Sequence, residues 1–301
     1  MSLSSIHRAG AAALLGLASL AAGCDRAEVP PLFDGLSAET IPTLPVQTVE
    51  LLVDDLRRDD LADYARHAVP PALHAQLETA WGEGRTLWPL TELPLDAKFQ
   101  GFLSALAAPG SEQQLLAAFG KQFAGATIEL RTAATTLGLF ATQYVTNEAA
   151  YSDVEREHYA QMIAALSRWG QRAPLGDPSR ARRAVPQLAL AARATGLGRP
   201  DGLRQAGMDR SLQRLGPFFA RMERVLRDYG LDFDAALKDM RISLVEQTGD
   251  RATVRLQYTL AGEAIDAVIL LERRDGRWYL SDLLRRAEAE AAARSAGPSS
   301  N

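Results

Sequence analysis

Histidine and carboxylate side chains at helical spacing are the first residues in this sequence that could do chemistry. Glu155 and His158 stand three positions apart, the spacing by which di-iron carboxylate bundles place two ligands on one helix face. Such bundles need a second Glu-x-x-His pair, and the sequence contains none. We therefore predict that Glu155 caps a helix, that His158 lies on the surface, and that neither binds a metal.

Two more histidines, His67 and His74, flank Pro70-Pro71 and could approach each other across the turn. Structural zinc takes four protein ligands and catalytic zinc takes three, so two imidazoles alone make a poor site. The sequence predicts no metal and no cofactor.

Motifs for covalent catalysis and for phosphate binding are missing from the sequence. It contains no Gly-x-Ser-x-Gly, Ser-x-x-Lys, Gly-x-x-x-x-Gly-Lys or Gly-x-Gly-x-x-Gly pattern. The acid pairs Asp54-Asp55 and Asp59-Asp60 are interpreted as helix-surface and capping residues rather than as acid–base groups. These observations favour a protein that is not an enzyme.

The composition is that of a globular protein. Of 301 residues, 47% are hydrophobic, which is enough for a core in one large or two ordinary domains. A net charge of -4 argues against a nucleic-acid partner. A single cysteine permits no disulfide within the chain and suits an oxidising compartment.

The N-terminal residues have the three parts of an export signal. Arg8 is in a short polar start, residues 9–23 are apolar and uncharged, and small residues lead to Cys24. The apolar run is shorter than the roughly 20 residues that span a bilayer. The stretch resembles the bacterial lipobox, at which lipoproteins are cut and acylated, although Ala21 stands where that pattern prefers leucine.

The lipobox resemblance implies that Cys24 carries a diacylglycerol and an N-acyl chain. Two or three acyl chains would anchor the protein in the membrane of a bacterial envelope, facing the periplasm. Asp25 is similar to an inner-membrane retention signal of enteric bacteria, so the inner membrane is favoured and the outer membrane stays open. The alternative for Cys24 is a chance cysteine behind an ordinary cleaved signal.

Prolines and a change of hydrophobic period divide the chain into five segments. The predicted segments are a signal peptide (1–23), a lipidated cysteine with a proline-rich tether (24–45), a helical region (46–208), a helix with an antiparallel meander (209–290) and a disordered tail (291–301). The helical region and the meander form either one domain with a helical insertion or two separate domains.

Capping patterns and apolar spacing predict helices throughout 46–208. Ser111 with Gln114 and Ser152 with Glu155 are predicted capping boxes. Residues 127–145 are rich in threonine, but their apolar residues keep a helical spacing and are interpreted as a helix.

Glycine and proline predict where some helices stop. Gly170 should end the helix that begins after Ser152, and Gly216-Pro217 should break a helical stretch that starts near Gly202.

From Arg241 the hydrophobic period changes to two. Alternating apolar residues predict strands, and Asp275-Gly276 predicts a two-residue hairpin turn between the last two. Residues 241–280 are therefore predicted to form a four-stranded antiparallel meander. The predicted fold class is α+β, a mostly helical body with this meander at its C-terminal end.

Helices followed by a curled meander resemble the nuclear-transport-factor-two-like (cystatin-like) superfamily. The resemblance covers about 212–284 and is carried by the element order and by the closing run Asp-Gly-Arg-Trp-Tyr-Leu at 275–280. It implies a concave sheet face that often lines a pocket for an apolar ligand. The candidate pocket residues are Tyr258, Trp278, Phe218, Phe219 and Met222. The alternative, which we favour, is that these residues pack as ordinary core.

Three functions follow from these observations. The first is a non-catalytic lipoprotein that binds an unknown protein partner or a small ligand. The second is a carrier of a small apolar ligand or lipid in a sheet-lined pocket. The third and least favoured is an envelope enzyme, for which titratable residues with perturbed pKa values in one cleft would be the sign.

Overall fold

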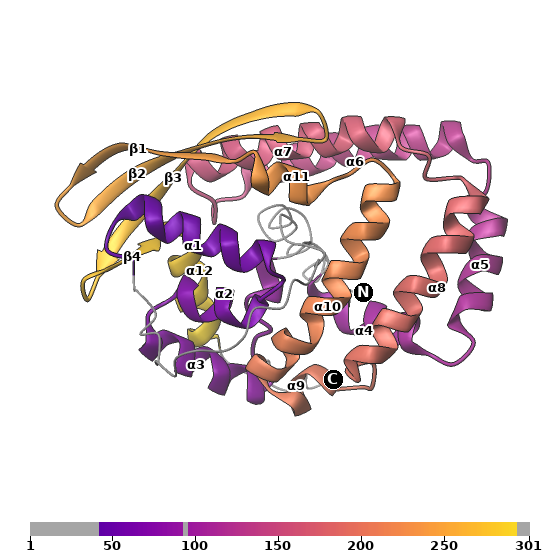
Figure 1. Ribbon diagram of the computed structural model, residues 1–301, viewed down its shortest axis with the longest axis horizontal. Helices are drawn as coiled ribbons and strands as arrows, with labels where there is room; N and C mark the ends of the chain where they lie inside the picture. The colour runs from indigo at the N-terminus through magenta and orange to yellow at the C-terminus, as the bar shows by residue number, and fades with distance from the viewer. Residues whose placement is uncertain (1–41, 93–95, 294–301) are drawn as a thin grey trace, which may run out of the picture.

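The computed structural model describes residues 42–92 and 96–293 and has an α+β architecture, which confirms the predicted fold class (Figure 1). The predicted signal peptide, Cys24, Asp25 and nearly all of the predicted tether lie outside the described residues. In chain order the elements are α1 (Pro45–Arg57), α2 (Leu61–Ala68), α3 (Pro71–Gly82), the 3-10 helix η3 (Leu90–Glu92), α4 (Asp96–Ala107), α5 (Ser111–Gln122), α6 (Thr127–Asn147), α7 (Asp153–Arg172), α8 (Pro178–Thr195), α9 (Gly202–Ala206), α10 (Met208–Asp228), α11 (Phe233–Lys238), β1 (Arg241–Thr248), β2 (Arg251–Leu260), β3 (Glu263–Arg274), β4 (Arg277–Leu280) and α12 (Ser281–Ala292).

The C-terminal meander is confirmed. Its four strands pair antiparallel in the order β1-β2-β3-β4, with a bulge in β1 between Leu244 and Glu246. Asp275 and Gly276 both have positive φ, 50° and 80°, as a type I′ turn between β3 and β4 requires.

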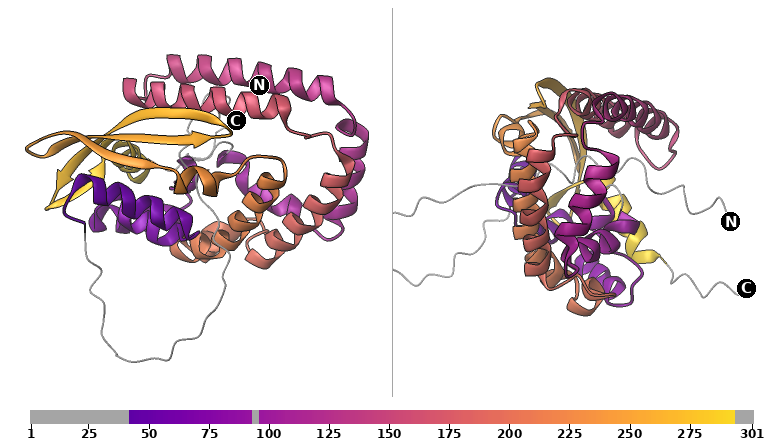
Figure 2. Two further views of the ribbon diagram at one scale, coloured as in Figure 1. Left: turned by 45° about the horizontal axis from the view of Figure 1, so that its top comes forward. Right: turned by 90° about the vertical axis from the view of Figure 1, so that its right-hand side faces the viewer.

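One hydrophobic core lies against the sheet. Alternate residues of β2 are buried, and they pack against Val49 of α1, Tyr159 of α7 and Phe233 of α11. The three helices come from distant parts of the sequence, and they cover one face of the sheet, because the intervening residues of β2 are largely exposed (Figure 2).

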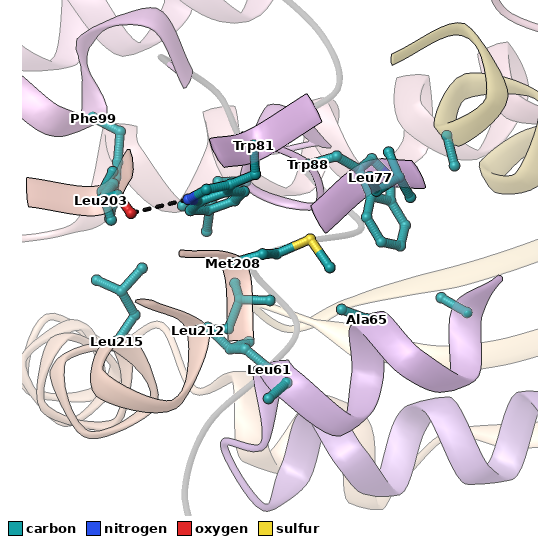
Figure 3. Close-up of a cluster of buried hydrophobic side chains, with 14 of the residues drawn as sticks. Leu61, Ala65, Leu77, Trp81, Trp88, Phe99, Leu203, Met208, Leu212 and Leu215 are labelled. Atoms are coloured by element: carbon teal, nitrogen blue, oxygen red, sulfur yellow. Dashed lines mark hydrogen bonds between the residues drawn. The ribbon is translucent and has the colours of Figure 1, made fainter. Parts of the chain in front are cut away.

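A second core joins α2, α3, α4, α10 and α12. Its largest side chains are Trp81 and Trp88, both fully buried (Figure 3). The indole Nε1 of Trp81 donates a hydrogen bond to the carbonyl oxygen of Leu203 at 2.9 Å, so the polar atom of this ring is satisfied inside the core.

Packing is continuous across the predicted segment boundary at 208. Helix α1 contributes Leu52 to the second core and Val49 to the sheet core. Tyr279 and Leu283, from the C-terminal segment, belong to the same core as Trp81. Residues from both sides of the boundary therefore share both cores.

The predicted capping boxes have different outcomes. Ser152 accepts from the backbone N–H of Glu155, and Glu155 accepts from that of Ser152, which confirms the box at the start of α7. The capping box predicted at Ser111 was wrong. The N-cap of α5 is Gly110, and the buried Ser111 hydroxyl donates to the carbonyl of Leu106 at 2.7 Å instead.

Two predicted helix ends were wrong. Helix α7 continues through Gly170 to Arg172, and α10 is continuous through Gly216 and Pro217. In α10, Phe218 and Phe219 are buried directly after the proline. Burial of two aromatic rings outweighs the hydrogen bond that proline removes, which costs about 3 kcal/mol.

Helix 127–145 was predicted correctly and is α6, which extends to Asn147.

Candidate functional site

A cavity of about 120 Å³ lies between α1, β3 and the first turns of α12. Helix α1 supplies four aliphatic side chains to its wall, because Val49, Leu52, Val53 and Leu56 follow the spacing of one helix face. Other apolar residues come from β3, α10 and α11, so most of the wall is hydrocarbon.

Strand β3 contributes to the wall at the part of its edge that is not paired with β4. β4 pairs with β3 only from Leu271 to Arg274. Farther along this edge, the Gln161 side chain of α7 donates to the carbonyl of Asp266 at 2.8 Å and accepts from its N–H at 2.9 Å. Val268 to Leu270 lie between these two covered stretches and line the cavity, and of the three Ile269 is on the buried face of the sheet, opposite Val254.

The polar groups of the wall gather around Arg286 of α12. Its Nε lies 2.8 Å from Oε2 of Glu92, and its Nη1 contacts Oε1 of Glu155. All three side chains are at least 85% buried. The guanidinium therefore bridges η3 and α7, which lie 63 residues apart at Glu92 and Glu155.

A second arginine, Arg285, extends this network to a third carboxylate. Nη2 of Arg285 lies 3.1 Å from Oε2 of Glu155 and 3.0 Å from Oδ1 of Asp282. The Ser152 hydroxyl donates to Oδ2 of Asp282 at 2.8 Å. The network joins the beginning of α7 to the beginning of α12.

Burial changes the protonation behaviour of Glu92. Removal from water raises the pKa of its carboxyl, the Arg286 guanidinium acts in the opposite direction, and Glu155 raises the pKa further. The net direction is upward, so this end of the cavity can hold a proton more readily than an exposed glutamate can.

His158 is buried and not on the surface, so that prediction was wrong. The side chain is 2% exposed, and its Nε2 lies 2.9 Å from the hydroxyl of Tyr258. Burial lowers the pKa of His158 from 6.5 to about 4, so the imidazole is neutral at pH 7. Sequence periodicity missed it because α7 is buried on two faces, by β3 and by α6.

Of the five candidate pocket residues, Phe219 lines this cavity and the other four do not. Tyr258 contacts His158, Trp278 donates to the carbonyl of Thr43 at 3.1 Å, and Phe218 packs against Phe219. Met222 is partly buried against the second core. Tyr258, Trp278 and Phe218 are thus part of the hydrophobic cores, and Met222 packs against one of them.

The histidines near Pro70-Pro71 contact acids. Nδ1 of His67 lies 2.6 Å from Oδ2 of the buried Asp55, and Nε2 of His74 lies 3.6 Å from Oδ1 of Asp209. Within residues 42–92 and 96–293, no three His, Cys, Asp or Glu side chains are placed to hold a metal ion.

A cluster of acids adjoins the cavity wall. Glu223 of α10, Asp59 before α2 and Asp234 of α11 meet next to Phe219 and Leu237, which line the cavity. Glu223 is 2% exposed, and neither carboxyl oxygen has a hydrogen-bond partner. Burial, Asp59 and Asp234 raise its pKa to about 11.

Comparisons with known protein families, curated proteins and solved structures found no similar protein. The lipobox and superfamily resemblances therefore stay predictions, and the interpretation of the cavity rests on its geometry.

The sequence did not single out Glu92 and Arg286. Arg286 carries a weak signal, because it follows the buried Leu283 by three residues and so belongs to the inner side of α12. A basic residue on an apolar helix face needs an acidic partner. Glu92 carries no signal that could have identified it as that partner.

Proposed function

We propose that this chain is a non-catalytic binding protein of the bacterial envelope, anchored by lipid on Cys24, and that it binds a small apolar ligand in the cavity. The supporting observation is the aliphatic wall of a cavity whose polar groups gather around Arg286. Its volume of about 120 Å³ is of the same order as that of an engineered apolar cavity, about 150 Å³, that binds benzene. The bound portion would be a ring or a short acyl segment.

The charged end of the cavity favours ligands without a strong net charge. Glu92, Glu155 and Asp282 are each already paired there with Arg285 or Arg286. A charged ligand would have to displace one of these pairs and leave its partner buried and unpaired, which costs several kcal/mol. A hydroxyl or carbonyl group can instead add a hydrogen bond to the existing pairs.

Binding of a neutral naphthylamine fluorophore tests this function. The wild-type protein should bind one equivalent saturably, and Ile269→Phe should weaken binding at least about ten-fold, because a larger ring on the buried face of β3 takes up the space of the ligand. Val245→Phe is the matched control, since Val245 belongs to the same sheet, is 55% exposed and does not line the cavity. Equal binding by both variants would contradict the proposal.

A second candidate is an enzyme that moves a proton on an apolar substrate. It is favoured by two wall residues with shifted pKa values, raised for Glu92 and lowered for His158. Glu92 is paired with Arg286, and the His158 ring with Tyr258, which favours the binding function instead. Chemical change of the bound ligand that stops in Glu92→Gln, while binding persists, would establish catalysis.

A further inference from the structure

Helix α6 is an outer helix that is packed on one side only. Its principal neighbour is α7, which lies between α6 and β3 (Figures 1 and 2). Of its 21 residues, only Val145 is fully buried. Four large apolar side chains are 67–75% exposed, namely Ile128, Leu137, Leu139 and Phe140.

After the charged residues Glu129 and Arg131 of its first turns, the rest of α6 carries no charged side chain. Residues 132–147 contain no Asp, Glu, Lys, Arg or His. The Thr135 hydroxyl donates to the carbonyl of Arg131 at 3.1 Å, and the Thr146 hydroxyl donates to that of Thr142 at 2.8 Å. These hydroxyl groups find partners within the helix, so they do not need water.

This concentration of apolar residues is unusual for a surface that faces only water. A single exposed leucine needs no explanation, and Leu190 of α8, 65% exposed, is such a case. On α6, at 3.6 residues per turn, Ile128, Leu139 and Phe140 fall within roughly a third of the helix circumference, on the side away from the buried Val145. Such a patch marks a surface that docks on something.

We propose that α6 lies in the interfacial layer of a lipid bilayer and holds the body of the protein against the membrane. The choice of lipid as the partner rests on the proposed anchor at Cys24. Twenty residues separate Cys24 from Pro45, where α1 begins, and span at most about 70 Å. A domain of this size has a radius of gyration of about 18 Å, so the body never leaves the neighbourhood of the bilayer.

Helix α6 would lie on the membrane rather than cross it. Among the described residues, every helix is too short or too polar to span a bilayer. A helix lying in the interface needs only one apolar face, and α6 keeps its opposite face against α7.

The test uses a fluorophore on α6. Cys24 is the only cysteine, so the chain 24–301 with Cys24→Ser accepts a single engineered cysteine. An N-terminal histidine tag takes the place of the acyl chains and leaves residues 25–44 intact. The tag binds the protein to vesicles of phosphatidylethanolamine and phosphatidylglycerol that contain some nickel-chelating lipid. Leu139→Cys carries a nitrobenzoxadiazole label, and Leu190→Cys, on α8 and similarly exposed, is the matched control.

We expect the label at 139 to brighten at least about two-fold, to shift to the blue on tethering, and to be quenched by spin-labelled acyl chains, with no change at 190. The same response at both positions would overturn the proposal. A shift at 139 that depends on protein concentration without vesicles would also overturn it, because a second copy would then cover α6. Because the nickel-bound tag replaces the natural lipid, a negative result would overturn only the membrane contact of α6. Acylation of Cys24 and ligand binding in the cavity are tested by separate experiments.

Discussion

At the scale of single residues, Arg286 is the side chain on which the polar end of the cavity depends. It pairs with two buried glutamates from η3 and α7. Removing one partner from a buried ion pair costs about 3–5 kcal/mol, because the remaining charges stay buried without compensation.

We expect Arg286→Met to lower the free energy of unfolding by about 3 kcal/mol, measured by urea denaturation. Arg274→Met is the matched control, because Arg274 also pairs with two glutamates, Glu272 and Glu288, but is 45% exposed. Loss of an exposed pair costs at most about 1 kcal/mol. Equal losses in the two variants would show that burial of the Arg286 network has no energetic consequence.

Glu223 gives the protein a stability that depends on pH. Its folded-state pKa is about 11, raised from 4.5 by burial and then by Asp59 and Asp234. The unfolded chain therefore releases this proton first, and stability falls as pH rises from 4.5 toward 11.

We expect Glu223→Gln to remove much of that fall and to increase the free energy of unfolding at pH 9 by at least about 2 kcal/mol, with little change at pH 5. Glu50→Gln, the same change on the exposed face of α1, should leave the pH profile of the wild type intact. The measurement is urea unfolding at both pH values. A variant whose stability falls with pH as steeply as that of the wild type would contradict the assignment.

At the scale of elements, α10 depends on a close approach to the turn before α2. A Cβ added at Gly216 would lie 2.3 Å from the backbone oxygen of Asp59, so only glycine fits. We expect Gly216→Ala to destabilise the protein by about 1–3 kcal/mol in thermal unfolding.

The control for this substitution is Gly120→Ala in α5. A Cβ at Gly120 meets nothing within 4 Å, so the helix preference of alanine should stabilise the protein by about 0.5–1 kcal/mol. We therefore expect the two substitutions to change the stability of the protein in opposite directions. Similar melting temperatures for both variants would show that α10 does not need this contact.

Elements with a local signal were predictable from the sequence. The meander follows from alternation and from Asp275-Gly276, and the cap of α7 follows from Ser152 and Glu155. The continuity of α10 was not predictable. It depends on burial of Phe218 and Phe219 by distant segments, which outweighs the local effect of Pro217.

At the scale of the whole molecule, the cavity assembles residues that no local pattern connects. Glu92 and Arg286 are separated by 194 positions, and no sequence pattern pairs them. The predicted pocket combined the strand residues Tyr258 and Trp278 with three residues of a helix, and the two strand residues are part of the sheet core. The wall instead uses α1 and the outer edge of β3.

The proposed anchor makes its own prediction for the whole protein. In bacteria grown with labelled palmitate, the wild type should take up the label, and Cys24→Ala should take up none and keep its signal peptide. Asp25→Ser should stay labelled and change only the membrane in which it is found. Label in Cys24→Ala, or its absence from the wild type, would contradict the lipid anchor.

Native mass spectrometry of the chain beginning at Asp25, purified from a bacterial periplasm, tests ligand binding most directly. The wild type should carry an additional species of a few hundred daltons, and Ile269→Phe should lose it because the cavity of about 120 Å³ is filled. The bare mass in the wild type, or the same additional species in both proteins, would contradict a ligand in this cavity.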